Sequence, residues 1–102
     1  MKSRLEAERR ELQGQIAELE RVLEVKPDYT LGAGDPAVYQ WEFNLAMRNQ
    51  AREKLQAIDA ALERLAAGRY GRCVRCGREI EEERLDLLPS TPVCIRCAQA
   101  RR

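Results

Sequence analysis

Apolar residues recur at helical spacing through the first quarter of the chain. The seam consists of Leu5, Leu12, Ile16, Leu19 and Leu23. Its members follow one another at steps of seven, four, three and four residues, with Arg9 in the one missing position. This spacing places the side chains along one stripe of a long amphipathic α-helix. Pro27 is expected to stop this helix.

A second helical stretch follows a loop that is rich in turn-forming residues. The loop spans residues 26–34 and contains Pro27, Gly32 and Gly34. Asp35 and Pro36 predict the start of the second helix, because Asp is a preferred N-cap and Pro at the first helical position loses no hydrogen bond. No proline or glycine interrupts the chain from there to Gly68, a predicted C-cap. A stripe of apolar residues leads up to this end: Leu55, Ile58, Leu62 and Leu65.

Two long helices joined by a short loop predict an antiparallel coiled-coil hairpin. We assign residues 1–67 to this hairpin, with a tip loop near residues 26–36. The leucine stripes alone give a shape and no activity, since a stable hairpin or a homodimerisation rod explains them equally well. Trp41 and Phe43, about two turns beyond the tip, are interpreted as packing residues.

Four cysteines carry the strongest chemical signal in the chain. They form two C-x2-C pairs, which are Cys73 with Cys76 and Cys94 with Cys97. This spacing is typical of a four-cysteine zinc site, and a closed tetrahedral site leaves no position for a reacting water. We therefore predict one structural Zn2+ in a small zinc finger over residues 68–102 that ends in a short C-terminal helix. The predicted fold class is mainly α. A thioredoxin-like redox pair lacks the βαβ pattern here, and paired disulfides remain an alternative.

Composition and charge narrow the possible functions. The 102 residues include 18 basic and 17 acidic side chains and no histidine, so imidazole catalysis and mixed Cys/His metal sites are excluded. The balance differs between the two parts: residues 1–67 carry 10 basic and 12 acidic side chains, and residues 68–102 carry 8 and 5. Zn2+ with four thiolates adds a charge of −2, which largely cancels the basic excess of the finger. No stretch approaches the ~20 apolar residues of a membrane span, and the N-terminus is charged, so we expect a cytoplasmic protein without membrane partners.

Specific residues around the cysteines resemble a known family. Gly77 and Ile80 follow the first pair, and Arg84-Leu85 and Pro89 precede the second. Upstream, the matching positions are Glu42-Phe43, Arg48-Asn49 and Gly68-Arg69-Tyr70-Gly71. These motifs resemble the DksA/TraR family of DnaK suppressor-like transcription regulators. The match covers roughly residues 35–97, and the first helix matches in architecture only.

The resemblance implies a bacterial regulator that binds RNA polymerase directly, and not DNA. It implies that the coiled-coil tip enters the secondary channel of the polymerase. The tip pattern of the family is Asp-x-x-Asp-x-Ala, in which Asp35 and Ala37 occupy the second and third places and Gly32 stands in place of the first aspartate. The resemblance thus assigns a partner-binding role to Asp35 and Ala37. Long family members respond to ppGpp through basic residues. In this chain, Arg64 is the one basic residue between positions 56 and 67 of the second helix, which leaves this response in doubt.

Two other classes of function compete with the polymerase-binding hypothesis. A nucleic-acid-binding zinc ribbon would use the finger arginines against phosphates, although glutamates interleave with them. A coiled-coil scaffold would form a dimer, whereas we expect a monomer. An enzyme is not expected, since the chain shows no phosphate-cradling glycine loop and no nucleophile paired with a base.

Overall fold

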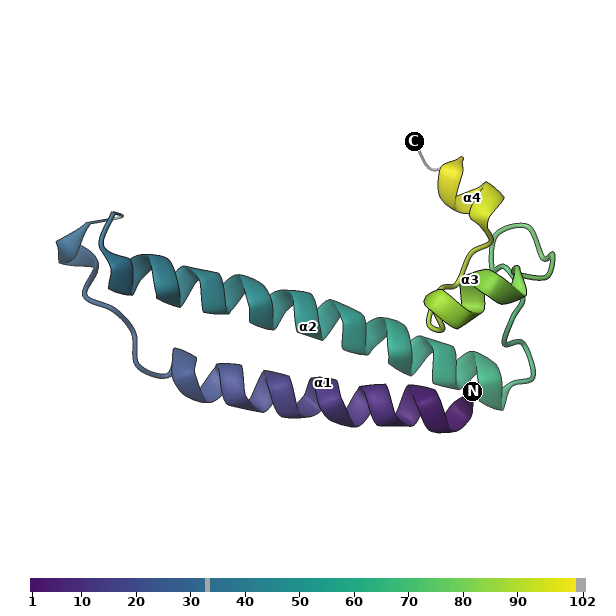
Figure 1. Cartoon of the computed structure of the whole chain (residues 1–102), viewed down its shortest axis with the longest axis horizontal. Helices are drawn as coiled ribbons and strands as arrows, with labels where there is room; N and C mark the ends of the chain where they lie inside the picture. The colour runs from purple at the N-terminus through teal and green to yellow at the C-terminus, as the bar shows by residue number, and fades with distance from the viewer. Residues whose placement is uncertain (33, 101–102) are drawn as a thin grey trace. The chain divides into compact units, whose positions relative to one another are not determined.

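The computed structural model describes residues 1–32 and 34–100. Five helical elements follow one another: α1 (Lys2–Leu23), the 3-10 turn η1 (Tyr29–Leu31), α2 (Pro36–Ala66), α3 (Glu82–Leu87) and α4 (Ile95–Gln99). Within the described residues, β pairing is limited to one isolated antiparallel bridge between Arg72 and Glu79. The mainly helical class and the short C-terminal helix are confirmed (Figure 1).

The chain divides into two compact units, and both long helices contribute to each. We call residues 10–55 the hairpin unit, and residues 1–9 together with 56–102 the finger unit. These compact units are not the predicted domains 1–67 and 68–102. The predicted boundary after residue 67 stays a prediction.

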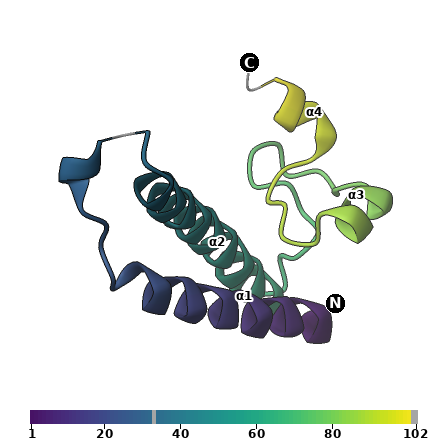
Figure 2. The same ribbon diagram turned by 60° about the vertical axis from the view of Figure 1, so that its left-hand side comes forward.

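In the hairpin unit, the end of α1 packs against the start of α2. Leu23 and Val38 are buried. The Trp41 Nε1–H donates a hydrogen bond to the Leu23 carbonyl at 3.1 Å, and the Tyr29 ring stands edge-on to the Trp41 ring at 6.3 Å between centroids. Further along, Arg52 forms an ion pair with Glu20 at 2.7 Å. These contacts confirm an antiparallel pair with Trp41 as a packing residue. Phe43 is 49% exposed, so its interpretation as a packing residue is wrong. The pair is drawn in Figure 1 and, turned by 60°, in Figure 2.

In the finger unit, the same helices meet at their other ends. Leu5 of α1 and Ala61 of α2 have no exposed surface, and Ile58 is buried. Arg9, in the seam position that lacks an apolar residue, forms an ion pair with Asp59 at 2.6 Å. An ion pair thus takes the place of an apolar contact at the seam position between Leu5 and Leu12.

Three helix ends follow the local sequence. The Asp35 carboxylate accepts the Ala37 N–H at 2.8 Å, which confirms Asp35 as the N-cap of α2. At the other end, Gly68 has a φ of 74°, and the N–H groups of Gly68 and Arg69 return to the carbonyls of Leu65 and Arg64, which is a Schellman cap. Helix α1 ends at Leu23, before Pro27. Among the helices described, none combines the length and apolar character needed to cross a membrane.

Candidate metal centre and hairpin tip

The first cysteine pair lies in a tight turn at the end of a short hairpin. The Gly77 N–H donates to the Cys73 carbonyl at 3.0 Å, and the Cys73 N–H donates to the Arg78 carbonyl at 2.8 Å. Gly77 has a φ of 77°, in the left-handed region that glycine adopts without strain. Gly77 thus allows the chain to turn directly after the first cysteine pair.

The second pair lies at the start of α4. Cys94 is the N-cap residue of α4, and Cys97 lies within the helix. The cap has no hydrogen bond from its own side chain; instead, the Glu81 carboxylate accepts the Ile95 N–H at 3.3 Å. A hydrogen bond from the Val74 N–H to the Pro92 carbonyl, at 2.9 Å, joins the two cysteine segments.

The four sulfur atoms converge with the spacing of a tetrahedral site. The Sγ atoms of Cys73, Cys76, Cys94 and Cys97 all lie within 4.8 Å of one another, and that of Cys76 is 3.7 Å from that of Cys94. Zn–S bonds of about 2.3 Å place tetrahedral sulfurs about 3.8 Å apart. The four cysteines are therefore positioned to bind one metal ion, and thiolate donors favour zinc. Among the described residues, disulfides are absent and all four cysteines are free.

The cluster holds one thiol that ionises easily and one that resists ionisation. Burial opposes the charged form of Cys73, but backbone N–H groups of Cys76, Cys94 and Arg75 donate to its sulfur, and its pKa is lowered to about 6. The hydrogen bond with Cys73 and burial raise the pKa of Cys97 to about 12. Neighbouring thiolates repel one another, so four of them are compatible only when a cation lies between them.

Three polar side chains fasten the segment before Cys94 to the rest of the finger unit. The Arg84 Nε donates to the Val93 carbonyl at 3.0 Å, and the Tyr70 hydroxyl donates to the Pro89 carbonyl at 2.8 Å. Arg64 is buried and makes longer contacts, at 3.4 Å, with the carbonyls of Ser90 and Thr91. Burial lowers the pKa of Arg64, and the nearby charge of Arg69 adds to this effect. These residues orient the second cysteine pair, and Arg84 is thereby unavailable as a phosphate ligand.

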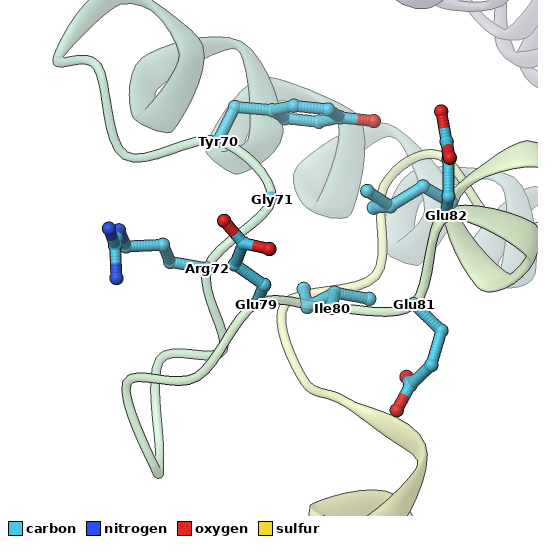
Figure 3. A pocket seen from close by; sticks show the side chains of 8 residues that line it. Tyr70, Gly71, Arg72, Glu79, Ile80, Glu81 and Glu82 are labelled. Carbon is cyan, nitrogen blue, oxygen red and sulfur yellow. The ribbon is translucent and has the colours of Figure 1, made fainter.

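A surface pocket of about 520 Å³ lies beside the first hairpin of the finger (Figure 3). Three glutamates line it, namely Glu79, Glu81 and Glu82, together with Tyr70 and Arg72. In Figure 3, the Arg72 side chain leaves the backbone on the side opposite to Glu81 and Glu82. No ligand cysteine lines this pocket in the part of the chain that the structure describes.

At the hairpin tip, the structure gives the exposure and the hydrogen bonds of the predicted contact residues. Asp35 is half-buried and engaged as the N-cap of α2, and Ala37 is exposed in the first turn of the helix. Gly32 ends the 3-10 turn with φ 93° and ψ 161°, a backbone conformation that is open essentially to glycine alone. An aspartate at position 32 would therefore be strained in this loop. Asp28, which the loop composition does not single out, caps the turn by accepting hydrogen bonds from the Thr30 N–H and hydroxyl.

Helical pairing together with a cluster of four thiols defines a class of protein, a helical hairpin joined to a four-cysteine zinc finger. Comparison with known proteins agrees with it. A family model described as the prokaryotic dksA/traR C4-type zinc finger matches residues 68–102. The solved structure of transcription factor DksA2 from Pseudomonas aeruginosa is 34% identical to this chain, with a TM-score of 0.77, and the match covers 98% of this chain and 78% of that one. The chain belongs to the DksA/TraR family.

Several curated relatives carry a functional name, among them the following two. The RNA polymerase-binding transcription factor DksA of Haemophilus influenzae is 38% identical over 65 residues, which is 62% of this chain and 45% of that protein. The protein of the same name from Escherichia coli strain K12 is 33% identical over 98 residues, which is 91% of this chain and 63% of that protein. The chain thus spans less than two thirds of the length of each of these relatives.

Proposed function

We propose that this protein binds bacterial RNA polymerase directly and regulates transcription from the cytoplasm, as a protein without catalytic activity. The observation that carries this proposal is the match of 91% of the chain to a protein named RNA polymerase-binding transcription factor DksA, and the structural match to transcription factor DksA2 supports it. The described fold is consistent with it, because the one cluster of metal-ligating side chains found among residues 1–32 and 34–100 is a closed set of four thiols.

Within this proposal, the hairpin tip acts in the secondary channel of the polymerase, with Asp35 and Ala37 as its contact residues. The hydrogen bond between the Ala37 N–H and the Asp35 carboxylate supports this role, since it orients the carboxylate before any partner arrives. Exposed apolar residues nearby also favour a protein partner. Tyr29 and Leu31 of the tip loop are 54% and 58% exposed. Burial of such side chains against a partner is favourable.

The arginines of the finger give less support to binding of nucleic acid. Arg84 donates to a backbone carbonyl within the finger, and Arg72 makes a contact of the same kind with Gly77. Glutamates line a pocket on the same segment. We therefore expect no direct binding to DNA. We also expect a monomer, which sedimentation of the zinc-loaded protein would test.

The proposal is tested by in vitro transcription with purified polymerase. Asp35→Asn keeps most of the capping ability and removes the charge. We expect it to bind polymerase in a pull-down but to lose most of its effect on transcript yield. Cys73→Ser is expected to lose binding as well, because the finger no longer folds around zinc.

Wild-type activity in Asp35→Asn would contradict the tip role, and no retention of polymerase by the wild-type protein would contradict the proposal as a whole. Parallel reactions with and without ppGpp measure the dependence that the sequence leaves open.

A further inference from the structure

Arginines share two surface pockets with the ligand cysteines. One pocket of about 340 Å³ is lined by Cys73 together with Arg64, Arg69 and Arg72. Another, of about 390 Å³, is lined by Cys76 and Cys97 together with Arg78 and Arg96. Among the described residues, no carboxylate lines either pocket. The acidic side chains Glu79, Glu81 and Glu82 line the pocket of Figure 3, of which Arg72 is also a lining residue. Positive charge is thus gathered on the surface that contains the sulfurs.

The finger arginines also differ from those of the long helices in how they are paired. Five arginines of α1 and α2 form ion pairs with glutamate or aspartate, and these are Arg4, Arg9, Arg21, Arg48 and Arg52. Within residues 68–100, no ion pair of this kind is formed. Even the bridge partners Arg72 and Glu79 do not form one. Among the described residues, Arg69, Arg72, Arg78 and Arg96 thus have no carboxylate within ion-pair distance.

A zinc ion bound by four thiolates supplies the missing negative charge, because the centre carries a net charge of −2. Arg69, Arg72, Arg78 and Arg96 are exposed, and of these Arg72 donates a hydrogen bond to the Gly77 carbonyl at 3.3 Å. Arg64 is different, since it is buried and contacts backbone carbonyls. We propose that these four exposed arginines act as the counter-charge of the metal centre and strengthen zinc binding by stabilising its dianionic form.

The size of the effect follows from Coulomb attraction in a partly solvated setting. A positive charge on the same surface is attracted to a dianion, but water and salt reduce the interaction at a protein surface. We expect each removed guanidinium to weaken zinc binding roughly two- to threefold at low salt. Removal of all four is expected to weaken it on the order of 30-fold, with a smaller loss at high salt. Substitution by lysine keeps the charge and should preserve most of the affinity.

The experiment measures zinc affinity by competition with a chromophoric chelator at fixed pH, in low and high salt. The test variant replaces Arg69, Arg72, Arg78 and Arg96 with glutamine, and a matched variant replaces them with lysine. A control variant, Arg10→Gln with Arg21→Gln, removes charge from the hairpin unit. Absorption of the cobalt-substituted proteins verifies a tetrahedral four-thiolate site in each. Single variants Arg72→Gln and Arg96→Gln keep the test valid if the fourfold variant fails to fold.

We expect the glutamine variant to bind zinc more weakly than the lysine variant, with a gap that narrows in high salt, and the control to stay within about twofold of wild type. Equal affinity of the glutamine variant and the wild type would overturn the proposal. Equal loss in the lysine and glutamine variants would also overturn it, since guanidinium hydrogen bonds such as that of Arg72 to Gly77 would then be responsible. Polymerase binding does not enter this test.

Discussion

The finger unit and the hairpin unit use their polar side chains differently. In the finger unit, Arg84 and Tyr70 donate to backbone carbonyls of the segment that leads to Cys94. In the hairpin unit, Arg52 pairs with Glu20 at the surface, and apolar side chains such as Phe43 stay half exposed. The segment around the metal centre is thus fastened by hydrogen bonds to backbone carbonyls, whereas α1 and α2 are joined by ion pairs between side chains. Both units leave apolar side chains exposed, such as Leu87 and Val25.

Removal of the metal should produce the largest difference in stability between the two units. Structural zinc contributes on the order of 10 kcal/mol to the folding of such sites at neutral pH. We expect a chelator, or Cys73→Ser, to unfold the finger, while much of the helical circular dichroism of α1 and α2 remains. Near-complete loss of helix signal on chelation would contradict this separation, because the long helices would then depend on the metal as well.

A substitution at the tip should produce the next largest effect. Gly32→Asp restores the first aspartate of the family pattern, but Gly32 has a φ of 93°. We expect a loss of about 1–3 kcal/mol, or a rearranged loop, because residues with a Cβ are strained in this region. Chemical denaturation measures the loss, and amide chemical shifts of residues 28–35 report the loop. Gly34→Asp is the matched control, since Gly34 is not in the positive-φ region. Unchanged stability and shifts in Gly32→Asp would contradict the prediction.

A smaller effect is expected from one hydrogen bond in the finger. Tyr70→Phe removes the hydroxyl that donates to the Pro89 carbonyl at 2.8 Å, and Pro89 is buried. The expected loss in the free energy of unfolding is about 1 kcal/mol. Tyr39→Phe serves as the control, because Tyr39 is 67% exposed on α2. Equal stability of Tyr70→Phe and the wild type would mean that this contact does not fasten the segment.

The smallest effect concerns the titration of Asp28 in the tip loop. Hydrogen bonds from the Thr30 hydroxyl and N–H lower the pKa of Asp28 below its ordinary value of 3.8. A lowered folded-state pKa means that the carboxylate stabilises the loop above pH 3.8, and that this contribution is lost as the pH falls through the lowered value. Thr30→Val should return the pKa towards 3.8, as measured by carboxyl carbon NMR. A pKa that stays equally low would assign the shift to another group.

Features that depend on neighbouring residues could be predicted from the sequence. The Asp35 cap, the Gly68 cap and the C-x2-C turns are local, so residue type and spacing determine them. Helix α3 was not predicted, although two glutamates in its first turn and Pro89 beyond its end are helix signals. These signals are weak in a helix of six residues.

Contacts between distant residues could not be predicted in the same way. Glu81 accepts the N–H of Ile95, fourteen positions away, and Arg64 contacts carbonyls 26 and 27 positions away. Every residue has a backbone carbonyl, so the sequence does not indicate which carbonyl accepts a hydrogen bond from a distant side chain. The positive φ of Gly32 was missed for a related reason, since glycine also occurs at many ordinary loop positions.

Helix α4 contains five residues, fewer than a helix needs to persist alone in water. It begins directly after one metal ligand, Cys94, and contains another, Cys97, so the bound ion nucleates it. The amide hydrogens of Ala98 and Ala100, which donate to the carbonyls of Cys94 and Arg96, are therefore protected only while the ion is held. The rate at which these amide hydrogens exchange with deuterated water therefore reports how long zinc stays bound.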